Sequence, residues 1–242
     1  MPESPAKLAT MMGHRFKDPK ILERALTHRS WAYENMPGVS DEVIRGVENE
    51  SMEFVGDSVL GLVIAEKLFQ AHPNSNEGDL TLMKHALVST ATLAKIADSM
   101  KIGDFLRVGR GEEKTGGRKK LALLANTLEA IIAAVFIDGG YSAARLFIGR
   151  VFDEEMRNAT PDNSIDYKTL LQERLQGAKM RAPSYSVIET TGPPHSRKFT
   201  VEAVWETGTT RAMGKTIKAA EMKAAEEALG HLDQQKPSQS RT

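Results

Sequence analysis

Apolar side chains recur at helical spacing through the first two thirds of the chain. This pattern predicts helices over residues 7–12, 19–26, 48–70, 80–100, 121–137 and 141–158. Asp18 and Pro19 stand where an N-cap and a first-turn proline begin a helix. Residues 36–47 and 103–120 are interrupted by glycines and are predicted to be loops. The first two thirds of the chain are therefore predicted to be entirely helical.

The last third of the chain carries a different, mixed pattern. A helix over residues 167–176 is followed by three segments with alternating, β-branched positions and then by a closing helix. The predicted strands cover residues 185–189, 198–204 and 210–214, and the closing helix covers residues 219–232. We therefore expect a helical domain over 1–158, a linker over 159–165, a small α+β domain with α-β-β-β-α order over 166–235, and a polar tail over 236–242.

Three carboxylates interrupt the apolar helix predicted over residues 48–70. Glu50, Glu53 and Asp57 occupy positions i, i+3 and i+7, which fall within about 60° of one another on a helix. Their neighbours are mainly apolar, and acidic side chains that enter a buried surface need a compensating positive charge. A hard divalent cation, which prefers oxygen ligands, would supply that charge. Alternatively, these carboxylates only favour the helix macrodipole and face solvent.

A second polar intrusion lies within the apolar helix predicted over residues 121–137. Asn126 and Glu129 occupy positions i and i+3 and share one face of that helix. Two buried helices that each present oxygen ligands from one face can enclose a divalent cation between them. The alternative is that Asn126 and Glu129 hydrogen-bond each other or cap a neighbouring helix.

Composition limits the remaining possibilities. Hydrophobic residues make up 40% and charged residues 26% of the chain, which is ordinary for a globular protein. The absence of cysteine excludes disulfides and thiolate metal sites. The formal net charge is zero, so any nucleic-acid contact must come from local patches. We identify no apolar run of membrane-spanning length, and we therefore expect a cytoplasmic protein without a membrane partner.

Four separated segments carry a family resemblance. Residues 49–58, Asn-Glu-Ser-Met-Glu-Phe-Val-Gly-Asp-Ser, resemble the signature of the ribonuclease III family, and residues 124–130, Leu-Ala-Asn-Thr-Leu-Glu-Ala, resemble its second acidic motif. Residues 25–30, Ala-Leu-Thr-His-Arg-Ser, and 109–112, Gly-Arg-Gly-Glu, are similar to two further family segments. The resemblance extends from about Leu8 to Leu232. It implies an all-α ribonuclease III endonuclease domain followed by a double-stranded RNA-binding domain.

The resemblance also implies a homodimeric endonuclease that hydrolyses double-stranded RNA with Mg²⁺, or with Mn²⁺ as a substitute. Its products are 5′-phosphate and 3′-hydroxyl ends, and its substrates are structured precursors such as ribosomal RNA and some messenger RNAs. By position, the metal ligands are Glu53, Asn126 and Glu129. Asp57 with Glu129 forms the catalytic pair that holds the attacking water and the scissile phosphate. Glu50 and Glu77 match further acidic positions near the site.

One residue departs from the family pattern, which usually has Asp where this chain has Asn126. An amide oxygen can bind Mg²⁺ but brings no negative charge, so we expect weaker metal affinity. The four acids Glu50, Glu53, Asp57 and Glu129 remain, and we therefore expect an active enzyme. The alternative is a protein that binds double-stranded RNA and cleaves it poorly or not at all.

The C-terminal domain resembles the double-stranded RNA-binding domain in residues 166–173 and 192–195. That match assigns contacts with 2′-hydroxyls and base edges to Thr169, Gln172, Glu173 and His195, and contacts with phosphates to Lys215, Lys218 and Lys223. The family usually has two adjacent basic residues where this chain has Ile217 and Lys218, so one phosphate contact is missing. Residues 166–233 hold 10 Lys/Arg against 9 Asp/Glu, and we therefore expect modest, salt-sensitive binding.

Residues 103–120 are rich in Gly, Lys and Arg but lack the Gly-x-x-x-x-Gly-Lys-Ser/Thr pattern of a phosphate-binding loop. We interpret them either as a flexible basic loop that touches the RNA backbone near the cut or as an ordinary surface loop. Four histidines lack the spacing of metal ligands, and we expect them at the surface or at helix ends: His14, His72, His85 and His231.

Overall fold

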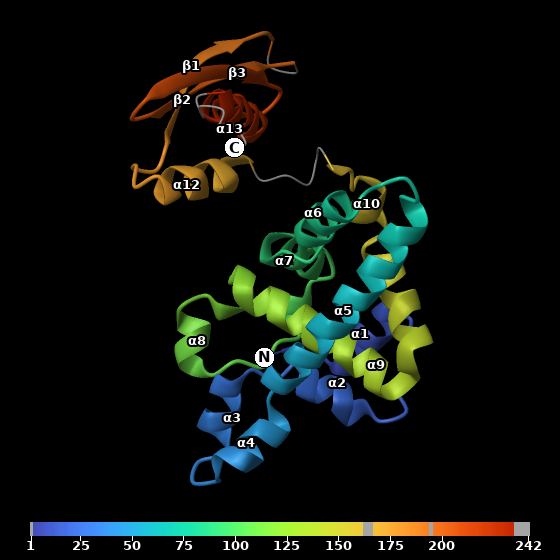
Figure 1. Ribbon diagram of the computed structural model, residues 1–242. Coiled ribbons are helices and arrows are strands. Elements are labelled where there is room, and N and C mark those ends of the chain that lie inside the picture. The colour runs from blue at the N-terminus through green and yellow to red at the C-terminus, as the bar shows by residue number, and fades with distance from the viewer. Residues whose placement is uncertain (1, 162–166, 194–195, 235–242) are drawn as a thin grey trace, which may run out of the picture. The chain divides into compact units, whose positions relative to one another are not determined.

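The computed structural model describes residues 2–161, 167–193 and 196–234. The chain forms two compact units, residues 1–165 and 166–242 (Figure 1). The described part of the first unit is helical, and the second unit contains a three-stranded sheet. The predicted fold class, an all-helical domain followed by a small α+β domain, is therefore confirmed.

The helices of the first unit follow the predicted order closely. They are α1 Pro5–Met12, α2 Pro19–Ala25, α3 Arg29–Asn35, α4 Asp41–Val47, α5 Glu50–Ala71, α6 Glu77–Leu87, α7 Thr90–Ser99, α8 Arg110–Lys114, α9 Leu121–Val151 and α10 Asp153–Arg157, with 3-10 turns η1 Ile102–Asp104 and η2 Gly117–Lys119. The Asp18 side chain accepts a hydrogen bond from the backbone N–H of Lys20, as an N-cap residue should.

Two predictions about local structure were wrong. Residues 36–47 were expected to form a loop, but α4 occupies their second half, with Asp41 and Glu42 in its first turn and Ile44 buried. Residues 80–100 were expected to form one helix, but they form α6 and α7. The break falls at Ser89, whose hydroxyl accepts a hydrogen bond from the backbone N–H of Thr92 and begins a new helix.

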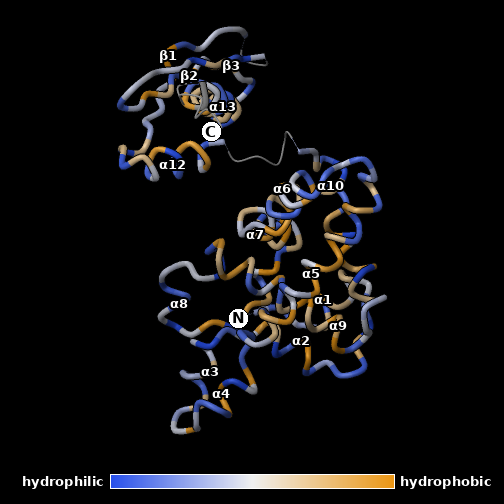
Figure 2. The backbone as a smooth tube through the Cα atoms, viewed as in Figure 1, coloured by the Kyte–Doolittle hydropathy of each residue, from blue (hydrophilic) through white to orange (hydrophobic). Residues whose placement is uncertain are grey.

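Helices α5 and α9 form the centre of the first unit, and Figure 2 shows hydrophobic residues along both. By length and apolar composition α9 could cross a membrane, so the expectation that no apolar run reaches that length was wrong. In this unit, 61% of its most apolar window is buried against the protein. A helix surrounded by other helices is apolar on all sides, which explains its composition.

Helix α9 changes direction at Gly140, where the backbone φ of 75° leaves the helical region. The sequence predicted one helix to end and another to begin at this point, and the non-helical backbone at Gly140 does separate two helical segments here. The buried Asp138 carboxylate just before the kink binds His14 Nε2 at 2.9 Å and the backbone N–H of Lys17 at 2.8 Å. His14 is therefore part of a buried contact and not a simple surface residue, because Asp138 needs partners when it is buried.

The second unit consists of α12 Tyr167–Gly177, β1 Ser184–Thr191, β2 Lys198–Trp205, β3 Gly208–Gly214 and α13 Ile217–Gln234. The strands form an antiparallel sheet in the order β1-β2-β3. Leu171 and Leu175 of α12 pack with Trp205 of β2 and with alanines of α13. Part of the predicted linker and the polar tail lie outside the described residues.

Candidate active site

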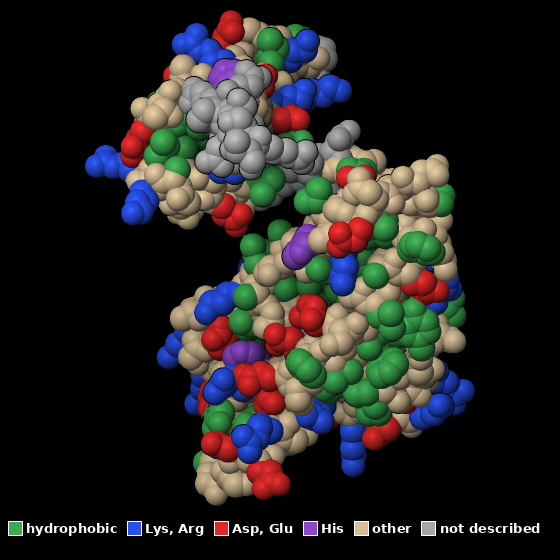
Figure 3. Space-filling view, in the orientation of Figure 1, with side chains coloured by type: hydrophobic (Ala, Val, Ile, Leu, Met, Phe, Trp, Pro, Cys, Tyr) green, Lys and Arg blue, Asp and Glu red, His purple; other side chains and the backbone are tan. Residues whose placement is uncertain are grey.

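The predicted acidic residues meet where α5 crosses α9. Glu53 and Asp57 lie on either side of Gly56 on α5, and a Cβ atom at Gly56 would lie 1.8 Å from the backbone carbonyl oxygen of Glu129. Only glycine permits this approach of the two backbones. Glu53, Asp57, Asn126 and Glu129 are called the acid cluster below, and Figure 3 shows carboxylates gathered on the face over α5 and α9.

The electrostatics of the acid cluster oppose ionisation of all its members together. Burial, with smaller contributions from the nearby charges of Asp57 and Glu53, raises the pKa of the Glu129 carboxyl to about 7. Burial also raises the pKa of Glu53, while a hydrogen bond with the Asn126 side chain opposes that rise. The three carboxylates are therefore close enough to repel one another, although they come from helices far apart in the sequence.

The partner of Asn126 settles one of the alternatives left open by the sequence. Its side chain hydrogen-bonds to Glu53 across the two helices, not to Glu129 on its own helix. The amide also brings no charge of its own. The acid cluster therefore contains three carboxylates and one neutral oxygen donor.

We tested whether a cation fits these residues. Within the described ranges, no three His, Cys, Asp or Glu side chains stand close enough together to hold a metal ion as they lie. The acid cluster is thus looser than a closed coordination shell, and its side chains would have to turn toward a shared ion. Its donor chemistry fits a hard divalent cation, because its side chains offer oxygens, and because burial, with the nearby charges of Asp57 and Glu53, raises the pKa of Glu129.

The two further acids predicted near the site belong to different helices. Glu50 is exposed at the start of α5 and pairs with Arg29 Nη1 at 3.0 Å. Glu77 is the first residue of α6. The charges that raise the pKa of Glu129 come from Asp57 and Glu53 and not from Glu77.

A cavity of about 330 Å³ adjoins the acid cluster at the N-terminal ends of α5 and α9. It is lined by His28, Asn49, Glu50, Glu53, Leu123, Asn126 and Thr127, and it is called the His28 cavity below. Burial lowers the pKa of His28, and the charges of Glu112 and Glu50 oppose that shift. His28 stands in one of the four segments with family resemblance, but its spacing in the sequence gives it no role. Proximity to the acid cluster is visible only in the folded chain.

Residues 103–120 are more ordered than the flexible basic loop that was one of their two interpretations. They contain η1, α8 and η2, and several of their basic side chains are paired: Arg118 Nε lies 2.7 Å from Glu113, and Lys120 Nζ lies 2.6 Å from Glu112. The glycines allow tight local turns, such as that at Gly116 with φ of 73°. This segment therefore presents less free positive charge than its composition suggests.

Several residues predicted to bind RNA gather on one side of the second unit. Thr169 and Gln172 of α12 and Lys218 of α13 line a cavity of about 560 Å³, together with Ile217 and the ion pair of Lys168 with Glu221. We call this surface the RNA-binding face after the prediction made from the sequence, which stays a prediction. Glu173, Lys215 and Lys223 are exposed, but Lys223 lies about 140° around α13 from Lys218. His195 lies outside the described residues.

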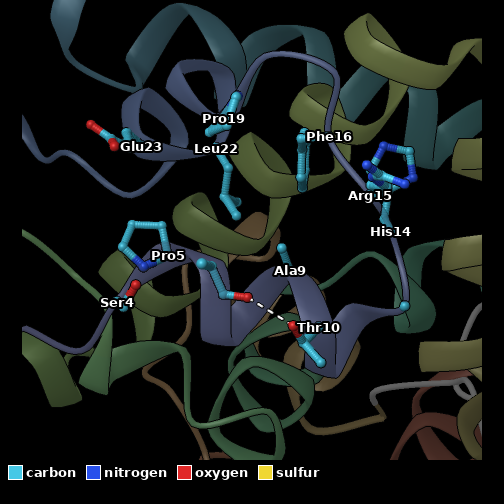
Figure 4. Close-up of a pocket in the computed structure, with 12 residues that line it drawn as sticks. Ser4, Pro5, Ala9, Thr10, His14, Arg15, Phe16, Pro19, Leu22 and Glu23 are labelled. Carbon is cyan, nitrogen blue, oxygen red and sulfur yellow. Dashed lines mark hydrogen bonds between the residues drawn. The ribbon is translucent and has the colours of Figure 1, made fainter.

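A further cavity in the first unit has mainly apolar walls. It measures about 550 Å³ and lies between α1 and α2 (Figure 4). Ala9, Phe16 and Leu22 supply its apolar walls, while Ser4 and Glu23 stand at one end. None of the acid-cluster residues lines it. The residues predicted to bind the metal therefore lie elsewhere, at the crossing of α5 and α9.

Family models match both units of the chain. Residues 18–155 match the model described as Ribonuclease-III-like, and residues 167–232 match the model described as Double-stranded RNA binding motif. The first match covers the acid cluster and the His28 cavity. The second covers the sheet and both helices of the second unit.

Curated relatives and solved structures agree with these models. The chain is 43% identical over 238 residues to Ribonuclease 3 of Solibacter usitatus, covering 93% of this chain and 86% of that protein. It is 42% identical to Ribonuclease 3 of Geobacter metallireducens, covering 95% and 92%. The nuclease domain of ribonuclease III from Campylobacter jejuni superposes with a TM-score of 0.56 at 36% identity, covering 63% of this chain and 98% of that one. The chain therefore belongs to the ribonuclease III family of double-strand-specific endoribonucleases, with a helical nuclease unit followed by a double-stranded RNA-binding unit.

Proposed function

We propose that this protein is a Mg²⁺-dependent endoribonuclease of the cytoplasm that processes structured precursor RNAs, such as ribosomal RNA and some messenger RNAs. The single observation that carries the proposal is the buried Glu129 carboxyl beside Asp57 and Glu53, with its pKa raised to about 7. Such a concentration of like charge is costly without a bound cation. Functional sites are where this cost is commonly retained.

The residues of the acid cluster have separate roles in this proposal. Glu53, Glu129 and the amide oxygen of Asn126 would hold Mg²⁺, or Mn²⁺ in its place. When bound, the ion lowers the pKa of water and neutralises charge on the phosphate. Asp57 and Glu129 orient the attacking water toward phosphorus by accepting its hydrogen bonds. The water oxygen forms a bond to phosphorus, the bond from phosphorus to the 3′-oxygen breaks, and that oxygen leaves and takes up a proton, so the products are 5′-phosphate and 3′-hydroxyl ends.

The second unit would hold the duplex during cleavage. In our proposal Thr169, Gln172, Glu173 and His195 contact 2′-hydroxyls and base edges, and Lys215, Lys218 and Lys223 contact phosphates. The gathering of Thr169, Gln172 and Lys218 around one cavity supports a common face for these contacts. Binding of this kind depends on shape and on salt concentration more than on sequence.

A homodimer through the nuclease unit is the third element of the proposal. Phe54, Leu62 and Phe69 of α5 are 76%, 59% and 71% exposed, and they fall within about 80° of one another around the helix. Figure 3 shows hydrophobic side chains beside the carboxylates on this face. An apolar stripe of this kind indicates a protein interface. The similar nuclease domain from Campylobacter jejuni is itself described as having a region involved in dimer formation.

Incubation of a long RNA duplex with Mg²⁺ and, separately, with Ca²⁺ tests the activity. We expect cleavage with Mg²⁺ alone, while both ions allow retention of the duplex in a gel. Glu129→Ala should abolish cleavage and leave binding intact, because Glu129 belongs to the first unit and the RNA-binding face to the second. Loss of binding in this variant would instead give Glu129 a structural role. Intact wild-type protein that fails to cleave in Mg²⁺ would contradict the proposal.

The second candidate function is binding of double-stranded RNA with weak or absent cleavage. The neutral Asn126 favours it, because its amide hydrogen-bonds to Glu53 and adds no charge to the acid cluster. Asn126→Asp decides between the two. For an active enzyme, we expect the substitution to lower the Mg²⁺ concentration for half-maximal cleavage by about tenfold, since carboxylates bind Mg²⁺ better than amides do. Wild-type protein that stays inactive until Asp is introduced would establish the binding function.

A further inference from the structure

Two segments with family resemblance and no assigned role, residues 25–30 and 109–112, meet beside the His28 cavity. We propose that His28 is a substrate-binding residue that donates its Nε2–H to a phosphate oxygen of the RNA backbone next to the cut. This inference rests on the proposed function and extends it by a further contact. Two observations support it. Hydrogen bonds fix the imidazole ring of His28, and the other donor side chains around the cavity already bond to the protein.

The hydrogen bonds of His28 determine which ring nitrogen carries the proton. The backbone N–H of Ser30 lies 3.3 Å from His28 Nδ1. A backbone N–H can only donate, so Nδ1 must accept and the proton of the neutral ring must be on Nε2. The Ser30 hydroxyl, 2.8 Å from Nδ1, also donates to this nitrogen. Nε2 is therefore a hydrogen-bond donor.

The segment at residues 109–112 holds this arrangement in place. The backbone N–H of Gly109 donates to the Ser30 hydroxyl at 2.9 Å, and the backbone N–H of Arg110 donates to Glu34 of α3 at 2.6 Å. A Cβ at Gly109 would lie 2.7 Å from the backbone oxygen of Ser30. This approach is open only to glycine. Ser30 is thus fixed from both sides, and it fixes His28 in turn.

Each of the other donor side chains around the His28 cavity already makes a hydrogen bond to the protein. Asn49 donates one amide N–H to the backbone oxygen of Ala25 at 3.1 Å, and Thr127 donates to that of Leu123 at 2.7 Å. The Asn126 amide is bonded to Glu53. Among the described residues that line this cavity, His28 is the one whose donor group makes no hydrogen bond to a protein acceptor.

The charged groups around the His28 cavity indicate that the acceptor for Nε2–H is a phosphate oxygen of the RNA backbone. Glu50 and Glu53 on the cavity wall repel a phosphate, so a donor with no competing acceptor is needed to hold one there. Nearby Arg29 is paired with Glu50, and Lys120 is paired with Glu112. The N-terminal ends of α5 and α9 add a favourable dipole at the same end of the cavity. A phosphate that flanks the scissile linkage fits these conditions.

Four proteins test this inference in single-turnover cleavage with Mg²⁺ and in duplex binding with Ca²⁺: wild type, His28→Ala, His28→Gln and the control His85→Ala. His85 is exposed on α6. We expect His28→Ala to slow cleavage roughly 10- to 100-fold, as loss of a bond to a charged group does. His28→Gln should recover most of the rate, because its Nε2 can donate from a similar position. Duplex binding in Ca²⁺ should weaken by no more than the same factor, and the thermal midpoint should change little.

A sulfur substitution in the RNA provides a readout that a structural role would not change. Duplexes with one phosphorothioate at each linkage flanking the cut should slow the wild-type protein at one position, because sulfur accepts hydrogen bonds poorly. His28→Ala should lose that sensitivity at the same position. An unchanged sulfur pattern, a wild-type rate in His28→Ala, or equal losses in the Ala and Gln variants with a lowered thermal midpoint would each overturn the inference. Failure of wild-type protein to cleave would instead contradict the proposed function.

Discussion

The acid cluster and the RNA-binding face use charge in opposite ways. The acid cluster brings three carboxylates together at a helix crossing, with Glu129 only 9% exposed and its pKa raised to about 7. The RNA-binding face leaves Thr169, Gln172 and Lys218 at the surface around an open cavity. Carboxylates that are buried close together repel one another, whereas exposed polar and positive side chains remain open to an outside ligand.

The two regions also differ in how strongly they depend on packing between helices. The acid cluster requires the close contact of α5 with α9 at Gly56, so it fails if that crossing widens. The RNA-binding face is formed by side chains at the ends of α12 and α13, and single substitutions there add or remove contacts one at a time. We therefore expect substitutions in the first region to act on stability and rate, and those in the second to act on affinity and salt dependence.

The largest expected effect is that of Gly56→Ala, which disturbs the acid cluster and leaves the RNA-binding face unchanged. Its Cβ would lie 1.8 Å from the carbonyl oxygen of Glu129, so α5 and α9 must move apart. We expect a loss of about 3 kcal/mol in the free energy of unfolding of the first unit, measured with urea, together with loss of cleavage. Gly61→Ala is the matched control, because its Cβ meets only the Lys84 side chain at 3.5 Å. It should change stability by about 1 kcal/mol or less. Equal effects of the two substitutions would contradict the tight crossing.

The second largest effect is expected in the pH dependence of the free energy of unfolding, which should reveal the raised pKa of Glu129. A carboxyl whose pKa rises in the folded state stabilises that state only while it is protonated. For Glu129 this contribution is full below 4.5 and is lost as the pH rises through about 7. Glu129→Gln mimics the protonated form at every pH. In a metal chelator, it should match wild type near pH 4.5 and be more stable at pH 8, by up to about 3 kcal/mol.

The measurement for Glu129→Gln is urea unfolding of both proteins across this pH range. Added Mg²⁺ should stabilise wild type at pH 8 more than the variant, because the ion replaces the missing positive charge. A constant difference between the two proteins from pH 4.5 to pH 8 would show that the Glu129 carboxyl keeps its ordinary pKa.

The smallest expected effect belongs to the RNA-binding face. Ile217 is 43% exposed and lines the same cavity as Lys218. Ile217→Lys should add one phosphate contact, tighten duplex binding at low salt and steepen the dependence of log affinity on log salt by about one. Binding titrations at several salt concentrations measure this slope, with Ile217→Gln as a control for loss of the apolar side chain. An unchanged slope would place position 217 outside the contact surface.

Much of the fold could be predicted from short-range patterns. Helical spacing of apolar residues located α2, α5 and α9, and alternation located the three strands, because these periods are properties of neighbouring residues. Short elements were harder. Helix α4 was missed because it has a single buried residue, Ile44, and therefore no apolar periodicity. The order in residues 103–120 comes from paired charges and from contacts with α3.

The sequence by itself determined that the protein has a helical nuclease unit and an α+β RNA-binding unit, and that acids share one face of each central helix. Only the tertiary structure decided which of those acids meet. Glu53 and Asn126 are joined across two helices, and Glu129 lies against Gly56, because burial of apolar surface brings α5 and α9 into contact. The position of His28 beside the acid cluster was decided in the same way. Such proximity depends on packing between distant segments, which local patterns do not encode.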